Sequence, residues 1–319
     1  DRKALEALKA VPGFDTVVKT YMNVLGEQMY KIENTSSYLK LGPNQLPEIY
    51  DILVRVCNKL GIYPIPDLFL SLNREPNAGT YGDTDIFIVL NSGLFEKLSL
   101  KQIETIIAHE CGHIICHHTL YHTMGKFIMN GVELFANGIL SKAVISTLQY
   151  AYAYWERCSE FSADRVSAFY HDSAEPVVDV MMALAGGTPN LKLNLNVKEF
   201  LKQAKDYKAL VDESTYNKVL EFVKFGDNNH PLNAYRAYEI NEFYEKYQKK
   251  LTYNNPDNKT EYNVAAVNNS IEWQKYDSWY AEGVFNNGKA VCDGIAKSFV
   301  ILAKMENIPC LRIEGNMHA

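Results

Sequence analysis

Two histidines four residues apart, with a glutamate beside the first, form the pattern in this sequence with the clearest chemistry. They are His109, Glu110 and His113, in the segment HECGH of a predicted helix. This spacing puts both imidazoles on one helical face, about one turn apart. Such a pair suits two adjacent corners of a tetrahedral zinc site, and Glu110 lies near enough to take a proton from a metal-bound water. The pattern predicts His109 and His113 as metal ligands and Glu110 as general base.

A catalytic zinc ion needs a third protein ligand and one open position. The candidate is Glu160, in the segment RCSEFSAD, which has a helical pattern. Asp164 follows four residues later and shares its face. We expect Glu160 to bind the metal, while Asp164 accepts the remaining N–H of a ligand histidine and orients it. The alternative is a solvated acidic face paired with Arg157 and Arg165.

Other potential ligands surround the motif. Three further histidines extend the metal helix: His117, His118 and His122. We interpret them as structural, because no glutamate is placed beside them as Glu110 is beside His109. Three cysteines are close to the motif or to Glu160: Cys111, Cys116 and Cys158. We expect buried, inert thiols at these positions.

Several elements must position these residues. A helix is predicted over residues 99–122, with Ser99 as N-cap and Gln102 in the capping-box position. An earlier helix, in LPEIYDILVRVCNKLG, has Pro47 in its first turn and Gly61 just past its end. Residues 1–40 and 150–170 also have helical patterns.

Two short apolar runs, residues 67–72 and 86–90, predict strands, with a turn-rich connection between them. Residues 86–90 are the expected edge strand, to which an extended peptide could add by main-chain pairing.

Composition places the chain among globular proteins. The 319 residues are 47% hydrophobic and 22% charged, which excludes a disordered or fibrous protein. A net charge of -6 does not favour non-specific binding of nucleic acid. Six cysteines in a chain of this length predict reduced thiols and a cytoplasmic location. The longest uncharged stretch of the apolar region, residues 143–155, is too short to span a membrane, so we expect no integral span.

Three motifs in this order resemble one family: HECGH, RCSEFSAD and HPLNAYR. Together with the stretch PNAGTYGDTDIFIVLNSGL, they resemble the HtpX-like and CAAX-prenyl-endopeptidase-like zinc metalloproteases, which are gluzincins, over residues 46–247. The resemblance implies zinc ligation by His109, His113 and Glu160, with Glu110 as general base. It also implies that His230 stabilises the tetrahedral intermediate; the alternative is a loop histidine ahead of a helix. Membrane members of the family carry spanning helices, so the chain looks like the soluble branch.

The resemblance leaves the role of Arg236 open. It could stabilise its own segment or stabilise a carboxylate.

A second constellation lies near the end of the chain. Cys292, in VCDGIAKSF, is at a predicted helix start, where the pKa of a thiol is lowered. His318, in GNMHA, could serve as its base. The two segments resemble the transglutaminase-like core, whose third residue, an aspartate on a later strand, has no counterpart before Ala319. The alternative is that Cys292 is a packed thiol without activity.

The predicted fold is α+β and mainly helical. Residues 1–253 form a zincin-type metalloprotease domain with a small sheet beside the metal helix. Residues 254–261 have the composition of a linker, and residues 262–319 form a partial transglutaminase-like α+β segment.

The predicted function is a zinc-dependent endopeptidase with one Zn²⁺ ion, which hydrolyses peptide bonds of a peptide or protein substrate through a zinc-bound water activated by Glu110. The alternatives are a cysteine-based hydrolase or acyl transferase centred on Cys292, and a zinc-binding scaffold without proteolysis.

Overall fold

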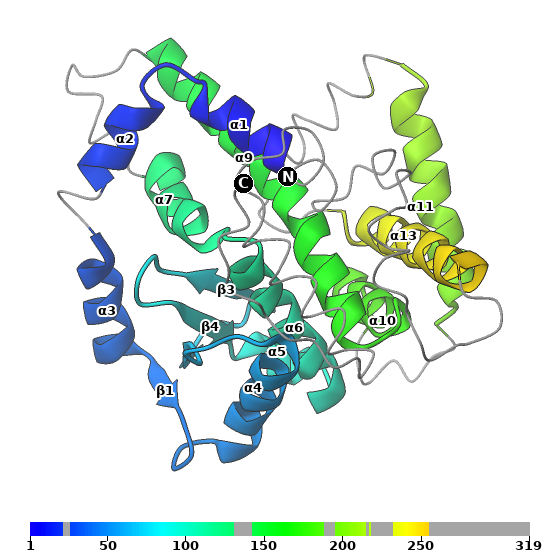
Figure 1. Cartoon of the computed structure of the whole chain (residues 1–319), viewed down its shortest axis with the longest axis horizontal. Helices are drawn as coiled ribbons and strands as arrows, with labels where there is room; N and C mark the ends of the chain where they lie inside the picture. Colours follow the sequence, from blue (N-terminus) through cyan, green and yellow to red (C-terminus); the bar gives the residue numbers. More distant parts are fainter. Residues whose placement is uncertain (22–25, 131–141, 188–194, 215–216, 218–231, 255–319) are drawn as a thin grey trace, which may run out of the picture.

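The computed structural model describes residues 1–21, 26–130, 142–187, 195–214, 217 and 232–254 (Figure 1). Helices dominate, and a small sheet lies among them, which confirms the predicted α+β class. The helices are α1 (Arg2–Lys9), α2 (Phe14–Thr20), α3 (Gly26–Ser37), α4 (Pro47–Leu60), α5 (Gly93–Lys97), α6 (Leu100–Ile115), α7 (Thr119–Asn130), α9 (Lys142–Tyr170), α10 (Glu175–Ala185), α11 (Val197–Asp212) and α13 (Asn233–Asn254). The strands are β1 (Leu39–Leu41), β2 (Asp67–Ser71), β3 (Ala78–Tyr81) and β4 (Phe87–Asn91).

The sheet has the strand order β1-β2-β4-β3. Strand β4 pairs in parallel with β2 and antiparallel with β3, so it lies inside the sheet. The prediction that residues 86–90 form the edge strand is therefore wrong. The edge strands are β1 and β3, and β3 forms within the stretch predicted to be a turn-rich connection. Glycine is depleted in strands, and Gly79 and Gly82 obscured this strand in the sequence.

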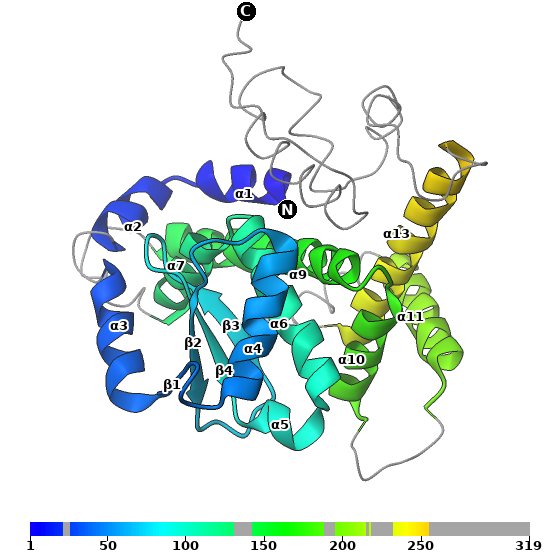
Figure 2. The ribbon, with the colours of Figure 1, turned by 60° about the horizontal axis from the view of Figure 1, so that its bottom comes forward.

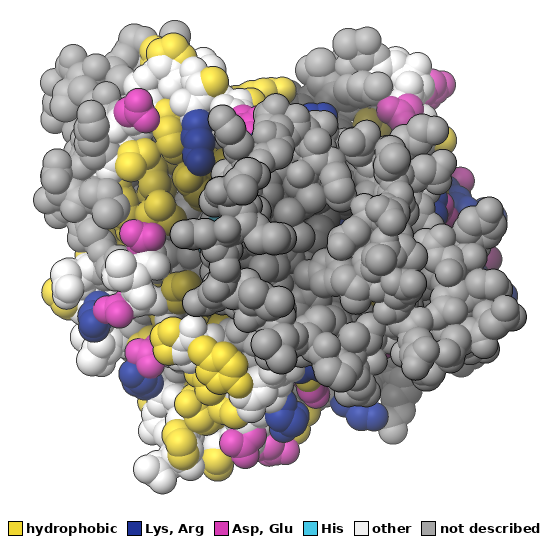
Figure 3. Space-filling model, viewed as in Figure 1, with side chains coloured by type: hydrophobic (Ala, Val, Ile, Leu, Met, Phe, Trp, Pro, Cys, Tyr) yellow, Lys and Arg dark blue, Asp and Glu magenta, His cyan; other side chains and the backbone are white. Residues whose placement is uncertain are grey.

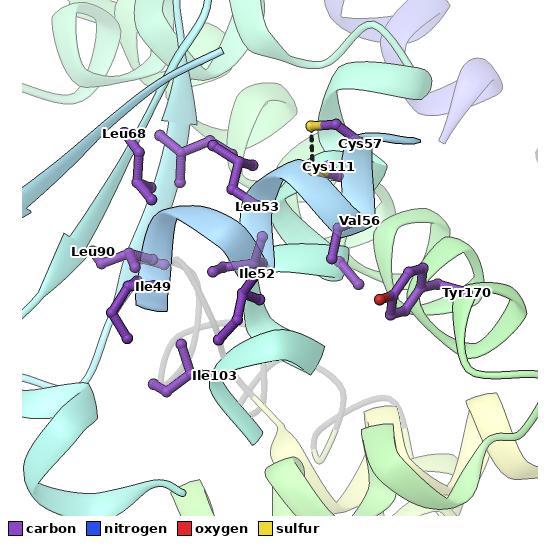
Figure 4. Packing of buried hydrophobic residues seen from close by; sticks show 14 of the residues in the cluster. Ile49, Ile52, Leu53, Val56, Cys57, Leu68, Leu90, Ile103, Cys111 and Tyr170 are labelled. Atoms are coloured by element: carbon purple, nitrogen blue, oxygen red, sulfur yellow. Dashed lines mark hydrogen bonds between the residues drawn. The ribbon is translucent and has the colours of Figure 1, made fainter. Parts of the chain in front are cut away.

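The two faces of the sheet contribute to different cores. Leu68, Ile88 and Leu90 point to one face and pack with residues of α4 and α6, as Figure 4 shows for part of the cluster. Phe69 and Phe87 point to the other face and pack with residues of α1, α2, α7 and α9. Helix α3 lies on this second side, opposite α4 and α6 (Figure 2).

Helix α4 begins with Pro47 and ends at Leu60, and Gly61, whose φ is 72°, lies just past its end, as predicted. Helix α6 begins with the predicted capping box: the Ser99 hydroxyl accepts from the Gln102 backbone N–H, and the Gln102 side chain accepts from the Ser99 N–H at 2.8 Å.

The continuous helix predicted over residues 99–122 is wrong, because α6 ends at Ile115. His117 adopts a left-handed φ of 57°, the His118 N–H donates to the His113 carbonyl, and α7 starts at Thr119. Most helix ends of this kind carry glycine or asparagine at the left-handed position. A histidine there gave no signal in the sequence.

Helices α6 and α9 pack closely, and this contact positions the predicted site. A Cβ atom at Gly112 of α6 would lie only 2.9 Å from Ala163 Cα of α9. The absence of a side chain thus lets the helices approach where His113 and Glu160 face each other. Helices α10, α11 and α13 form a further group at one side of the molecule, around a core to which the end of α9 also contributes (Figures 1 and 2).

Four cysteines lie in the described ranges, Cys57, Cys111, Cys116 and Cys158, and all are free thiols, as expected. Cys111 is buried as predicted, whereas Cys116 and Cys158 are only half-buried. The sulfur atoms of Cys57 and Cys111 are 4.0 Å apart in the core (Figure 4).

Among the described residues, no helix combines the length and apolar character that crossing a membrane requires. On the face drawn in Figure 3, acidic and basic side chains lie interspersed among hydrophobic ones over the described atoms.

Candidate metal centre

Three potential metal ligands from two helices converge on one point. His109 and His113 project from α6, and their Nε2 atoms are 3.1 Å apart. Glu160 of α9 places Oε2 at 3.4 Å from Nε2 of His109 and Oε1 at 3.4 Å from Nε2 of His113. The ligand atoms all lie within 4.8 Å of one another, and the three residues are buried. The helices thus bring together the two histidines and the glutamate that the sequence singled out.

A buried ion pair lies behind these ligands. Asp164 Oδ1 is 2.9 Å from Nδ1 of His109. Arg236, from α13, donates to both oxygens of Asp164, at 2.8 and 2.7 Å, and its Nη1 is 3.1 Å from Glu160 Oε2. Of the two roles considered for Arg236, the structure shows the contact with carboxylates. Glu160 and Asp164 are each 1% exposed, so the alternative of a solvated acidic face is wrong.

Charge and burial act in opposite directions on the histidines. Burial alone would lower the pKa of His109, but Asp164 and Glu160 outweigh it and raise this pKa to about 10. Burial lowers the pKa of His113 to about 3. Burial also works against the charged form of Asp164, yet Arg236 and His109 hold its pKa below the ordinary value. Because metal ligands must be deprotonated, a metal ion that binds here competes with a proton for His109.

Glu110 faces a cavity beside the three ligands. Its Oε2 accepts a 2.6 Å hydrogen bond from the hydroxyl of Thr80, which lies on the edge strand β3. Glu110 and His109 both line a cavity of about 470 Å³. Apolar residues of α10, among them Val177 and Met181, form part of the wall. A carboxylate held in this way can accept a proton from a molecule in the cavity.

His118 is the site neighbour that sequence analysis interpreted as structural. Its Nδ1 is 2.9 Å from Nδ1 of His113, and its Nε2 is 2.9 Å from Asp1 Oδ2. The side chains thus connect Asp1, the N-cap residue of α1, through His118 to His113. Asp164 makes a corresponding direct contact with His109. The turn at residues 116–118 places His118 there, and a continuous helix would not have done so.

Two further groups of side chains could also hold an ion: one is His113, His118 and His122, and the other is Asp1, Cys116 and His118. The set of His109, His113 and Glu160 differs from both, because it joins two imidazoles to a carboxylate at the edge of the cavity that Glu110 lines.

Other predicted residues lie outside the described ranges. They are His230, Cys292 and His318, together with residues 255–261 of the linker and the segment 262–319. Their predicted roles stay predictions.

A helix pair that joins two histidines and a glutamate beside a cavity has the arrangement of a metal-dependent hydrolase. A model of peptidase family M48 matches residues 43–243. The chain belongs to this family and is a metal-dependent protease. The match confirms the resemblance found over residues 46–247 and ends before the predicted transglutaminase-like segment.

The chain is similar to a protein of Arabidopsis thaliana named "Plastoglobule-localized metallopeptidase 48, chloroplastic", with 29% identity over 245 residues, which cover 76% of this chain and 70% of the relative. It is 28% identical to "Protease HtpX" of Legionella pneumophila over 119 residues, or 37% of this chain and 39% of the relative. No solved structure matches the chain. The predicted cytoplasmic location stays a prediction.

The ion pair of Arg236 allows a test of what holds the centre together. Replacing Arg236 by methionine leaves Asp164 and Glu160 buried without their positive partner. We expect the metal-free protein to lose about 3–5 kcal/mol of its free energy of unfolding, measured with urea. The control is Arg55→Met, since Arg55 is 56% exposed and lies 3.6 Å from Glu104. It should cost less than about 1 kcal/mol. Equal losses in the two variants would show that the buried pair is not needed for folding.

Proposed function

We propose that the protein is a zinc endopeptidase in which His109, His113 and Glu160 bind one Zn²⁺ ion and Glu110 acts as general base. The observation that carries this proposal is the convergence of these three ligand residues within 4.8 Å. Two nitrogens and one oxygen suit zinc, and three protein ligands leave one position open, as catalytic sites require. Asp164 orients His109, because its carboxylate lies beside the imidazole nitrogen that faces away from the metal position.

Zinc in such a site lowers the pKa of a bound water to about 7 and polarises the carbonyl group that is attacked. Glu110 accepts the proton of the attacking water and then gives it to the leaving amine. The hydrogen bond from Thr80 to Oε2 holds the carboxylate in one orientation beside the cavity. The role of His230, which stabilises the oxyanion in this proposal, rests on the HPLNAYR motif alone.

The substrate is a peptide or protein segment that adds to the free edge of β3. Within the described sheet, β3 pairs only with β4 and leaves its other edge available. This edge runs beside the centre, because Ala78 lines the cavity and Thr80 contacts Glu110. Main-chain pairing fits an endopeptidase, since it holds an extended chain with little regard to its sequence.

Two conservative substitutions separate general base from metal ligand. Glu110→Gln should keep one zinc per chain, because all three proposed ligands remain, but turnover should fall by roughly 10²–10⁴-fold. Glu160→Gln should lose zinc together with activity, because a neutral amide is a poor zinc ligand. Zinc content by mass spectrometry and cleavage of a peptide library by the same preparations measure both effects.

Loss of zinc in Glu110→Gln but not in Glu160→Gln would mean that base and ligand have been exchanged. Equal loss in both variants would mean that the two roles are not separate. Full activity of Glu110→Gln would exclude the proposed mechanism. A wild type that holds zinc but cleaves no peptide would favour the alternative of a scaffold.

The chain from His113 through His118 to Asp1 generates a further prediction. When His113 presents Nε2 to the metal, its Nδ1–H donates to His118 Nδ1. His118→Phe removes this acceptor, and zinc affinity should fall by roughly 10–100-fold, as measured by competition with a chelator. His118→Asn keeps an acceptor oxygen and should restore much of the affinity.

The matched control is His117→Asn, one residue earlier. His117 is exposed and has a φ of 57°, which asparagine tolerates. Zinc affinity should not change in this variant. An unchanged affinity in His118→Phe would show that His113 needs no partner at Nδ1.

A further inference from the structure

A second cavity, of about 360 Å³, lies on the opposite face of the edge strand from the metal centre. Its walls come from α3, from strands β3 and β4, and from the chain that leads into β3. Both cavities reach the start of β3, because Glu75, Asn77 and Ala78 line each of them. The edge strand therefore forms a partition between the two cavities.

The side chains of β3 point alternately toward the two cavities, so one peptide bound along this strand could reach both. Thr80 points to the face of the metal centre, whereas Gly79 and Tyr81 line the second cavity. Successive side chains of a strand point to opposite faces of its sheet. A peptide that extends this sheet must follow the same alternation. If one of its side chains enters the cavity beside Glu110, the adjacent side chain points toward the second cavity.

Asn34 is a buried polar residue at the wall of this second cavity. It is 3% exposed and lies within α3. Among the described residues, its carboxamide has no hydrogen-bond partner, while its backbone carbonyl accepts from Tyr38. Buried polar side chains nearly always have a partner, and an unpaired one destabilises the folded protein. The Asn34 side chain is therefore available to a group that enters the cavity.

The other lining residues indicate the chemistry of that group. Glu33 and Glu75 contribute carboxylates, and no lysine or arginine is among the described residues that line the cavity. Aromatic rings complete the wall: Tyr30 stacks on Tyr81 at 6.3 Å, and Phe87 lies 5.7 Å from Tyr81. An arginine side chain fits this combination, because its planar guanidinium stacks on aromatic rings and donates to carboxylate and amide oxygens.

We propose that the second cavity is a subsite for a basic side chain of the substrate, arginine in particular, at the position adjacent to the residue that enters the metal-centre cavity. The guanidinium donates hydrogen bonds to the carboxylates of Glu33 and Glu75 and to the side-chain oxygen of Asn34. The tyrosine rings stack against its plane. This inference rests on the proposed function, because it uses the same bound peptide. The subsite would give the protease a preference for a basic residue at one substrate position, whereas main-chain pairing with β3 does not depend on the substrate sequence.

The test uses pairs of eight-residue peptides that carry either arginine or citrulline at one position. Citrulline has nearly the same shape as arginine but lacks its charge. Binding is measured by fluorescence anisotropy with the zinc-loaded Glu110→Gln protein, so that the peptides stay intact. Arginine at the position next to the residue beside Glu110 should bind about 10-fold or more tightly than citrulline, since hydrogen bonds to charged groups are the strong ones. At other positions the two residues should bind alike.

Substitutions of Glu33 show whether this cavity is responsible. Glu33→Gln, added to the same protein, should reduce the arginine-to-citrulline ratio toward one without weakening the citrulline peptides. Glu33→Lys should reverse the preference, so that a peptide with glutamate binds better than one with glutamine. The control is Glu48→Gln, an exposed residue in the first turn of α4, which should leave the ratio unchanged.

Equal binding of arginine and citrulline peptides at every position, or a ratio that Glu33→Gln does not alter, would overturn the subsite. The proposed protease mechanism fails separately, if the wild-type protein binds these peptides and cleaves none of them.

Discussion

The buried contact of Arg236 with Asp164 and Glu160 is the interaction on which the metal centre depends. Two buried carboxylates of α9 face two buried histidines of α6, and one guanidinium from α13 lies among them. Unpaired buried charges are costly, so the carboxylates need this partner in order to stay charged. One guanidinium does not neutralise two carboxylates. The centre therefore retains a net negative charge, which a proton on His109 or a metal cation can balance.

The same contact joins parts of the fold that are far apart in the sequence. Helix α6 comes from the sheet-containing layer, α9 crosses it at Gly112, and α13 belongs to the group formed with α10 and α11. The Arg236 side chain reaches from this group to the face of α9 that carries Glu160 and Asp164. The edge strand β3 completes the arrangement, since Thr80 connects it to Glu110. The proposed ligands, the proposed base and the proposed peptide-binding edge thus come from separate elements that converge at one place.

The sequence predicted those parts of the site that depend on local spacing. The four-residue intervals between His109 and His113 and between Glu160 and Asp164 put each pair on one helical face, and the ends of α4 and the start of α6 followed from Pro47, Gly61 and Ser99. Features that depend on tertiary contacts were missed. Strand β3 forms only because β4 supplies its partner, and the turn before α7 has a histidine where glycine would have signalled a helix end. Both errors concealed neighbours of the site, namely Thr80 and His118.

Anomalous diffraction at the zinc absorption edge, from crystals of the wild-type protein grown with one equivalent of zinc, tests the central claim most directly. The account predicts a single strong anomalous peak, with two histidine nitrogens at about 2.0–2.1 Å and a carboxylate oxygen at about 2.0–2.2 Å. These ligands should be His109, His113 and Glu160, and Asp164 should remain on Arg236. A peak bound by His118, His122 or Cys116 in their place, or zinc on Asp164, would contradict it.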